Sequence, residues 1–377
     1  MKVKIGIIGC GAIVQRAYLP GFSEPDSPLA KRAMQGHFHN GCADVQVVAL
    51  ADINESLTAK LAEEYGVSKV YTDWQKIISD PKIDAVCVAT PNYLHAEMVI
   101  AALKAGKHVL VEKPMAVSWH DVKEMVRIAK ASKLALLVNH SFRYNPIYEK
   151  AREIILSGLL GEIYSIRGRF SYAGPEHWTG SATTWFLDKE MAGGGALFDA
   201  GIHAVDLIRF LVDKPVIQVG SLLGTLEKKI QAEDNSVTIM KFDDGSLGTL
   251  EASWTTRPGE IVTTVYGSEG NMLVDMGEGS ASLSGQQAPP LSVLFAPPQT
   301  TYMNMKMPPG QLRIPVFIPD IDESSKVGGP YRHFVECILT DKEPISSGQD
   351  AMSSMEILFA SAQSNQSQKI ITLPLKN

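Results

Sequence analysis

The sequence predicts an α/β protein: an N-terminal Rossmann domain on a doubly wound parallel sheet, then a C-terminal α+β domain with a large, mostly antiparallel open sheet. Three observations support this prediction. Strand and helix patterns alternate through residues 1–143, and a Gly-Cys-Gly turn follows the first strand pattern. After residue 143 the apolar residues alternate as in half-buried antiparallel strands. We therefore expect one domain at residues 1–143 and another at residues 144–377.

Length and composition are those of a globular enzyme with two domains. The chain has 377 residues, 45% of them hydrophobic and 20% charged, and one core seldom serves a chain of this length. The net charge of −6 and the lack of a basic block argue against a nucleic-acid partner. No apolar run reaches the roughly 20 residues that cross a bilayer, so we expect no membrane partner. The four cysteines have no C-x-x-C spacing, which favours reduced thiols in the cytoplasm.

The glycine-rich turn predicts a dinucleotide site. Gly9 permits a tight turn, and Gly11 lets the backbone approach a ligand closely. Ala12 and Ile13 then begin a helix, whose unpaired N–H groups favour a pyrophosphate. The third position of the fingerprint holds Val14 in place of Gly or Ala, so the motif is incomplete.

Two other interpretations of this segment are a strand–turn–helix without a ligand and a secretory or lipoprotein signal. The apolar run from Ile5 to Cys10 is shorter than the roughly 7–15 residues of a signal peptide, and glycine interrupts it. Dinucleotide binding is therefore the favoured interpretation.

Asp52 follows the second strand pattern, residues 45–51, where a Rossmann domain binds the ribose hydroxyls of NAD. No arginine follows to hold a 2′-phosphate, so NAD is favoured over NADP. Asp52 could instead, or in addition, cap the helix expected at residues 55–65. The preceding segment, residues 22–43, is expected to be an inserted loop. Its His37 and His39 lack further metal ligands, so we predict no metal site.

Two further strand patterns, residues 84–89 and 108–111, end in Thr90-Pro91-Asn92 and Glu112-Lys113-Pro114. Ligands of doubly wound sheets bind outside the carboxyl ends of the strands. These two turns are therefore expected beside the glycine-rich turn.

With these motifs the chain resembles the glucose–fructose oxidoreductase/inositol dehydrogenase/MocA (Gfo/Idh/MocA) family over nearly its whole length. The motifs are the glycine-rich turn, residues 90–95, residues 112–114, residues 139–143 and a downstream Gly-Gly-Gly…Asp-x-Gly-x-His. The resemblance implies that Lys113 contacts substrate and nicotinamide and precedes a cis proline bond. It further implies that the cofactor is also bound by Thr90, Asn92, His95 and Glu112, and the substrate by Arg143.

The second half predicts an antiparallel sheet. Residues 163–172 alternate apolar and polar side chains. Two hairpins follow, pairing residues 237–242 with 247–254 and residues 261–266 with 272–276. The resemblance implies an exposed sheet face used for oligomer contacts, and hence a homodimer or homotetramer.

A glycine run at residues 193–195 precedes Asp199 and His203, which are four apart and so share one helical face. A neutral imidazole beside a carboxylate can take a hydroxyl proton near neutral pH. His203 matches the catalytic histidine of the family, and Asp199 matches the acidic residue that acts with it. The alternative is an Asp–His pair on a helix surface.

Two other features of the second half are less specific. Trp178 and Trp185 would suit the apolar side of a sugar ring, or would anchor a long loop. The Pro-rich residues 286–319 are expected to form an extended, ordered meander.

Together these features predict an NAD(P)-dependent oxidoreductase, with NAD preferred, that transfers hydride between nicotinamide and a secondary hydroxyl of a sugar, sugar derivative or inositol. His203 would remove the hydroxyl proton while Lys113 and Asp199 orient the substrate. Two alternatives are an NAD-dependent glycosidase acting by oxidation and elimination, and a non-catalytic regulator that senses NAD or sugar.

Overall fold

The computed structural model describes residues 2–32, 41–179, 184–276, 291–295, 300–302, 305–307, 314–317 and 327–375, with only the backbone at 178, 179, 184, 295 and the segments between 300 and 317. These residues form two compact units. Unit 1 comprises Met1–Asn145, Ser181–Gly194 and Glu323–Met355, and unit 2 comprises Pro146–Gly180, Gly195–Asp322 and Glu356–Asn377. Two segments that we expected in the second domain, residues 181–194 and 323–355, thus cluster with unit 1.

Unit 1 is built on a six-stranded sheet in the order β3-β2-β1-β4-β5-β6, and every neighbouring pair is parallel. The predicted parallel sheet is confirmed. Its strands are short and almost entirely apolar: β1 (Val3–Ile8), β2 (Val45–Ala51), β3 (Lys69–Tyr71), β4 (Ala85–Val88), β5 (His108–Val111) and β6 (Leu136–Val138). Strand β3 was not predicted, because three residues carry too little periodicity.

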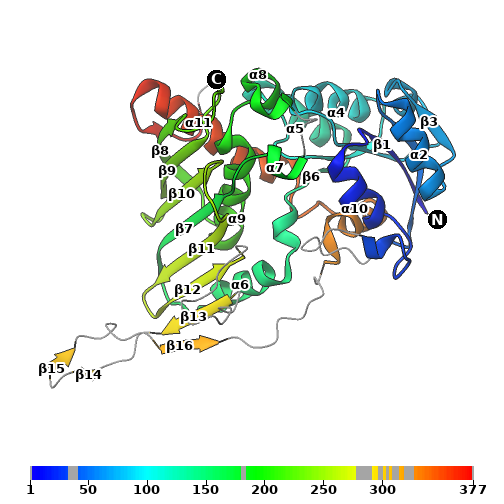
Figure 1. Ribbon diagram of the computed structural model, residues 1–377. Helices are drawn as coiled ribbons and strands as arrows, with labels where there is room; N and C mark the ends of the chain where they lie inside the picture. The colour runs from blue at the N-terminus through cyan, green and yellow to red at the C-terminus, as the bar shows by residue number, and fades with distance from the viewer. Residues whose placement is uncertain are drawn as a thin grey trace. The chain divides into compact units, whose positions relative to one another are not determined.

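The helices of unit 1 up to α5 lie between these strands in the sequence, and the later ones follow the last strand (Figure 1). They are η1 (Val14–Tyr18), α1 (Leu19–Gly21), η2 (Ala30–Arg32), α2 (Glu55–Tyr65), α3 (Gln75–Ile78), η3 (Asn92–Leu94), α4 (His95–Lys104), α5 (Trp119–Ser132), η4 (Ser141–Tyr144), η5 (Thr184–Leu187), α8 (Lys189–Ala192) and α10 (Gly329–Thr340). Asn54 caps α2 by accepting a hydrogen bond from the backbone N–H of Leu57 at 3.1 Å. The cap that we considered for Asp52 therefore belongs to Asn54.

Helix α10 completes the core of unit 1 from a distant part of the sequence. The ring of its Tyr331 lies 4.7 Å from that of Tyr18 and 5.0 Å from that of Phe22. The expected loop at residues 22–43 thus begins in the core, because Phe22 is buried. His37 and His39 lie outside the described residues.

Unit 2 is built on a nine-stranded sheet in the order β16-β13-β12-β11-β7-β10-β9-β8-β17. Strands β7 and β10 pair in parallel and the other neighbours are antiparallel, which confirms the predicted sheet. The strands are β7 (Ile163–Ser171), β8 (Val216–Gly224), β9 (Asn235–Phe242), β10 (Leu247–Ser253), β11 (Glu260–Gly267), β12 (Gly270–Asp275), β13 (Leu291–Phe295), β16 (Ile314–Phe317) and β17 (Ile371–Thr372).

The Pro-rich stretch supplies two of these strands, β13 and β16. It also forms a separate hairpin of β14 (Thr300–Tyr302) and β15 (Met305–Met307). Where it is described, this stretch is extended, as predicted. The rest of it lies outside the described residues.

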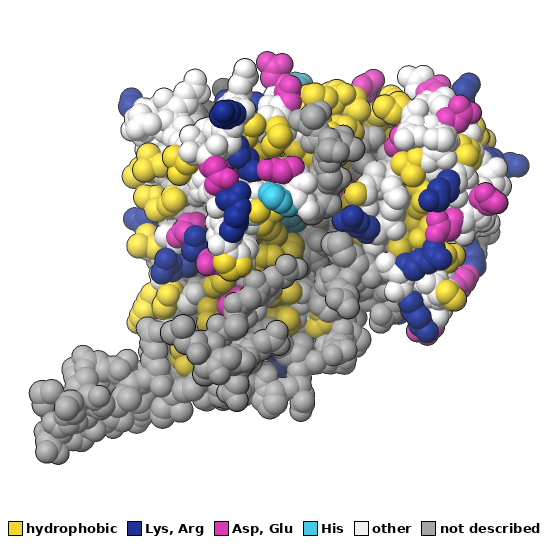
Figure 2. Space-filling model, viewed as in Figure 1, with side chains coloured by type: hydrophobic (Ala, Val, Ile, Leu, Met, Phe, Trp, Pro, Cys, Tyr) yellow, Lys and Arg dark blue, Asp and Glu magenta, His cyan; other side chains and the backbone are white. Residues whose placement is uncertain are grey.

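Helices cover one face of the sheet of unit 2 (Figure 1). They are α6 (Pro146–Leu156), η6 (Leu197–Gly201), α9 (Ile202–Val212) and the second half of α11 (Gly348–Ser367), with the short α7 (Glu176–Thr179) at the end of β7. The opposite face exposes the apolar side chains of Leu222, Val237, Ile239 and Leu247. Figure 2 shows hydrophobic side chains along the margin formed by β8, β9 and β10. Within the described residues, every helix is too short or too polar to cross a membrane.

Candidate functional site

The glycine-rich turn of unit 1 has two glycines with different tasks. Gly9 has a φ of 91°, and a Cβ there would lie 2.4 Å from the carbonyl oxygen of Ala89. Gly11 is exposed, and a Cβ there would meet no atom within 4 Å. Gly9 is therefore required by the fold, whereas the open space at Gly11 is what a ligand backbone contact needs.

The helix after this turn opens irregularly. Ala12 and Ile13 are half-buried at its start, and residues Val14–Tyr18 form a π-helix. Val14, the residue that departs from the fingerprint, is fully buried in the core. The N–H groups of the helix start thus stand beside Gly11, as a pyrophosphate site requires.

Asp52 joins the turn directly. Its Oδ2 accepts a hydrogen bond from the backbone N–H of Cys10 at 2.7 Å, and its Oδ1 accepts one from Asn54 at 2.8 Å. Burial raises the pKa of the Cys10 thiol to about 12, and the charge of Asp52 adds to this shift. The half-buried carboxylate lies at the carboxyl end of β2, where a ribose diol would bind.

A cavity of about 230 Å³ lies beside this edge at the end of β3. The backbone N–H of Asp52 donates to the carbonyl of Tyr71, which lines the cavity. The lining residues are Glu55, Val70, Tyr71, Thr72, Asp73 and Lys76. The backbone of Asp52 is thus joined to one wall of this cavity, while its carboxylate is bonded to the backbone N–H groups of Cys10 and Asn54.

His95 holds two turns together. It is fully buried, and its Nδ1 and Nε2 each lie 2.9 Å from a carbonyl oxygen, of Pro114 and of Thr90 respectively. Burial lowers the pKa of His95 to about 4, although the two carbonyls oppose this shift. We expected His95 to contact the cofactor; because both ring nitrogens are occupied and buried, its role is to position the turns at Thr90 and Lys113.

Asn92 and Thr90 lie at the carboxyl end of β4. Asn92 is buried and donates from Nδ2 to the carbonyl of Ala192 at 2.9 Å. Thr90 is half-buried, with its Oγ1 3.6 Å from the sulfur of Met98. Of the two, Thr90 leaves more surface for a cofactor, and Asn92 anchors the segment that precedes the glycine run.

Glu112 is anchored beneath the Glu-Lys-Pro turn. Its Oε1 accepts hydrogen bonds from the Tyr18 hydroxyl at 2.8 Å and from Nδ2 of Asn139 at 2.6 Å. Burial raises the pKa of Glu112. The half-buried Lys113 follows, and the Lys113–Pro114 bond is cis, as the resemblance implies.

Arg143 is not placed to bind a substrate. Its guanidinium is buried, donates to the carbonyl of Ile345 at 2.7 Å and pairs with Asp350 at 2.6 Å. The expected substrate contact is therefore replaced by a structural role, in which Arg143 ties η4 to the start of α11.

Asp199 lies at the centre of the polar cluster in unit 2. Its carboxylate is 7% exposed, and its Oδ2 accepts hydrogen bonds from the hydroxyl of Tyr172 and from Nε1 of Trp254, the latter at 3.0 Å. Tyr172 and Trp254 follow the parallel strands β7 and β10, in which Ser171 pairs with Ser253. The parallel pairing brings both donors to one carboxylate oxygen.

His203 is half-buried, in the first turn of α9. Its ring stacks on that of Phe170 in β7, with centroids 4.9 Å apart and planes inclined by 25°. The packing against Phe170 restricts the orientation of the imidazole. Asp199 and His203 thus lie four residues apart on one helical segment, each held by a neighbouring strand.

Of the two tryptophans proposed to bind a sugar ring, Trp178 and Trp185, only Trp185 has a described side chain. Trp185 is half-buried in unit 1 and stacks on Phe186 with centroids 3.9 Å apart. The side chain of Trp178 lies outside the described residues. Downstream, Gly193 packs against Val117, which follows the Glu-Lys-Pro turn; a Cβ at Gly193 would lie 3.1 Å from Val117.

Sequence reasoning missed Tyr172 and Trp254 as partners of Asp199, and Tyr18 as a partner of Glu112. Each pair is distant in the sequence, so no spacing connects them. The available signal was weak: a buried indole or phenol needs an acceptor. In the described parts of the chain, no group of three or more His, Cys, Asp or Glu side chains is arranged to hold a metal ion.

Two family descriptions match the chain. Residues 3–140 match "Oxidoreductase family, NAD-binding Rossmann fold", and residues 148–273 match "GFO/IDH/MocA C-terminal domain". The matched segments correspond to the bulk of each sheet.

Similar proteins are named as dehydrogenases and reductases of sugars. Levoglucosan dehydrogenase of Pseudarthrobacter phenanthrenivorans is 31% identical over 280 residues, which cover 67% of this chain and 71% of that protein. The 1,5-anhydro-D-fructose reductase of Ensifer adhaerens is 32% identical over 229 residues, covering 60% and 68%. The structure of levoglucosan dehydrogenase with NADH and levoglucosan covers both chains fully, with a TM-score of 0.77 and 24% identity, and so has the same fold.

Alanine substitutions should separate the two glycines of the turn. Gly11→Ala meets no atom, so the free energy of unfolding should change by less than about 0.5 kcal/mol. Its methyl group should weaken NADH binding by about 1–3 kcal/mol, the usual cost of an inserted group in a packed site. Gly9→Ala should instead destabilise the fold, since its Cβ would meet Ala89. Urea denaturation and NADH fluorescence titration measure the two effects; unaltered NADH affinity in Gly11→Ala would contradict the assignment.

Protonation of His95 should make the fold acid-sensitive. Its pKa is lowered from 6.5 to about 4, so the unfolded chain binds the proton more tightly. The stabilisation from the neutral ring is complete above pH 6.5 and is lost as the pH falls towards 4. We expect a loss on the order of 3 kcal/mol across this window, measured by urea denaturation at successive pH values. The matched variant His95→Gln should show a shallower dependence, and equal slopes would refute the assignment.

Proposed function

Because the chain belongs to the Gfo/Idh/MocA family of oxidoreductases, we propose that it is an NAD-dependent dehydrogenase of a secondary hydroxyl on a sugar, sugar derivative or inositol. The observation that carries the proposal is the buried carboxylate of Asp199, held by two donors, four residues before His203. The relatives described above are named for levoglucosan and for 1,5-anhydro-D-fructose, which supports the substrate class.

The residues of unit 1 fit NAD. The pyrophosphate would be held by Gly9, Gly11 and the N–H groups at Ala12 and Ile13, where the space above Gly11 is open. Asp52 would accept hydrogen bonds from the adenosine ribose, and its charge would repel a 2′-phosphate, so NAD is preferred over NADP. When bound, nicotinamide supplies the hydride acceptor.

The proton chemistry would come from three side chains. His203 accepts the proton of the reacting hydroxyl, because a half-buried neutral imidazole suits that task. Lys113 donates a hydrogen bond to the same oxygen and balances its developing charge. Asp199 orients the substrate through its carboxylate.

The half-buried Trp185 stays a candidate for stacking on the sugar ring, with Trp178 proposed on sequence grounds alone. All four cysteines are buried free thiols, which supports the cytoplasm as the location.

We further propose that the open sheet face of unit 2 binds a second copy of the chain, giving a homodimer or homotetramer. On that face Leu222 pairs across strands with Val237, and Ile239 is 53% exposed. Beside them Arg169 forms ion pairs with Glu251 and Glu260, at 3.5 and 2.7 Å. An apolar area next to charges of both signs is self-complementary in a two-fold pairing.

The dehydrogenase proposal predicts turnover that depends on His203. We expect NADH formation with at least one of levoglucosan, myo-inositol and D-xylose, which the names of relatives suggest as a first panel, and lower activity with NADP. His203→Ala should lower kcat by about 10²- to 10⁴-fold if it is the base, whereas the exposed His120→Ala should not. The measurement is NADH absorbance.

Full turnover in His203→Ala would remove His203 from this role. Hydrolysis of a glycoside without release of NADH would decide instead for the glycosidase chemistry. Sugar binding without any turnover would favour a sensor.

A charge placed on the open sheet face should split the oligomer. Ile239→Lys would bury an ammonium group against apolar side chains in the oligomer, which is costly. The molar mass of the variant in solution should therefore be lower than that of the wild-type protein. The matched control is Leu156→Lys, an exposed leucine on α6. Light scattering coupled to gel filtration measures the mass, and an unchanged oligomer in Ile239→Lys would show that the interface lies elsewhere.

A further inference from the structure

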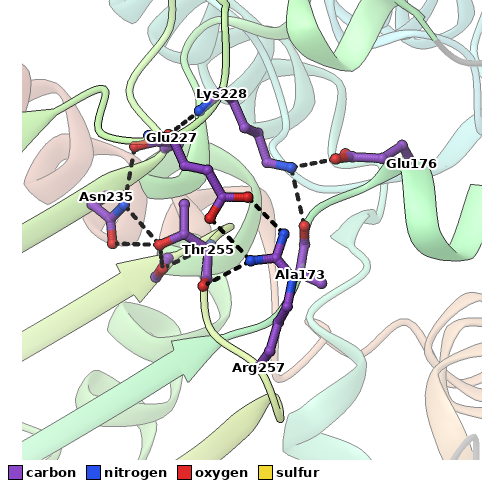
Figure 3. Close-up of polar contacts among 9 residues, drawn as sticks. Ala173, Glu176, Glu227, Lys228, Asn235, Thr255 and Arg257 are labelled. Carbon is purple, nitrogen blue, oxygen red and sulfur yellow. Dashed lines mark hydrogen bonds and ion pairs between the residues drawn. The ribbon is translucent and has the colours of Figure 1, made fainter.

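The loop between β8 and β9, residues 225–234 (the β8–β9 loop), is bonded to the helical segment that carries Asp199 and to the segments that carry its donors Tyr172 and Trp254. Figure 3 shows Glu227 and Lys228 of this loop among their polar contacts. The bonds fall into three groups: to the start of the helix that carries Asp199, to Trp254, and to the segment after Tyr172. None of the loop's residues belongs to the motifs that identified the chain.

Glu233 holds the start of the η6–α9 helical segment. Its Oε1 accepts hydrogen bonds from the backbone N–H groups of Gly195 at 2.8 Å and Leu197 at 3.1 Å. Its carbonyl oxygen accepts one from Ala196 at 2.9 Å. A carboxylate at this end also interacts favourably with the positive end of the helix dipole. Glu233 thus accepts hydrogen bonds from three consecutive backbone N–H groups, of residues 195–197, at the start of the segment that carries Asp199.

Gly195 is shaped to this contact. A Cβ at Gly195 would lie 1.8 Å from the carbonyl oxygen of Glu233, so no other residue fits without moving the loop or the helix. This gives the last glycine of the run a specific cause: close approach of the β8–β9 loop.

Asp234 connects the same loop to the indole donor. Its carbonyl oxygen accepts a hydrogen bond from the backbone N–H of Trp254 at 2.8 Å, and Nε1 of Trp254 donates to Asp199. The buried carboxylate of Asp234 accepts from the backbone N–H groups of Leu226, Glu227 and Lys228, at 2.7–2.9 Å. Asp234 therefore closes the loop on itself while it holds Trp254.

Lys228 connects the loop to the phenol donor. Its ammonium donates to the carbonyl of Ala173 at 3.0 Å and pairs with Glu176 (Figure 3). Ala173 follows Tyr172, whose hydroxyl donates to Asp199. The side chain of Lys228 is only 9% exposed, so the contact is well shielded from water.

We propose that Glu233 is a positioning residue of the reaction, which sets Asp199 and His203 through the helix start, and that Lys228 does the same for Tyr172. This inference rests on the proposed dehydrogenase function. Neither residue touches the reacting atoms; each acts through the residues that it holds.

The test compares four variants of the full chain. Glu233→Ala removes the two side-chain bonds to the helix start, and Glu233→Gln keeps an oxygen that can accept both. Lys228→Met removes the bond to Ala173 and the ion pair with Glu176 while keeping an unbranched apolar side chain of similar size. The control is Asp244→Ala, which removes a carboxylate that accepts from Ser246 in the hairpin at the opposite end of β9 and β10.

In Glu233→Ala, hydrogen exchange of the amides of residues 197–203 should be about 2- to 30-fold faster, the range expected for a lost helix cap. With the best substrate of the sugar panel, kcat should fall about 10- to 100-fold, while the KM for NAD, set by unit 1, stays constant. Glu233→Gln should recover most of kcat. Lys228→Met should also lower kcat and leave the KM for NAD unchanged. The control Asp244→Ala should lower the melting temperature and leave both kinetic constants unchanged.

Unchanged exchange in Glu233→Ala, or a loss of kcat no larger than that of Asp244→Ala, would overturn the inference. Failure of the proposed function is read separately, from a wild-type protein that forms no NADH with any sugar. Hydrogen exchange then decides on its own whether Glu233 holds the helix start.

Discussion

The structure of unit 2 depends on the burial of one charge. A carboxylate that is almost removed from water is costly unless it is hydrogen-bonded, and Oδ2 of Asp199 accepts hydrogen bonds from both Tyr172 and Trp254. Those donors come from the ends of β7 and β10, which run in parallel within a mostly antiparallel sheet. Two antiparallel neighbours would have delivered their final residues to opposite ends of the sheet. The parallel pair is therefore the feature of the topology that makes this polar cluster possible.

In unit 1, several residues of the two motifs that identify the family stabilise the turns of the protein. In the Thr-Pro-Asn and Glu-Lys-Pro turns, a residue of the motif need not contact a ligand. His95, Asn92 and Glu112 instead use their polar atoms to hold neighbouring turns in register. Hydrogen bonds within such buried networks are stronger than in water and make the turns rigid. The motif is thus largely a set of supports beneath Lys113.

The sequence predicted the two sheets and most of their strands because apolar periodicity is a local property. It did not distinguish side chains that meet a ligand from those that meet the protein. Arg143 and His95 lie within recognisable motifs, yet their burial follows from packing against Asp350 and Pro114, which no local pattern reveals. The hydrogen bonds of Tyr172 and Trp254 to Asp199 could not be predicted for the same reason. The last glycine of residues 193–195 was noticed, but its cause lay in Glu233, almost forty residues away.

The fit between Gly195 and Glu233 has a consequence for anyone who reshapes this protein by exchanging loops. A Cβ at Gly195 would lie only 1.8 Å from the carbonyl oxygen of Glu233. Residues 195 and 233 therefore have to be exchanged together. A β8–β9 loop taken from another protein must have a backbone that passes residue 195 without a clash. A side chain introduced at position 195 alone requires the loop or the start of the helix to move.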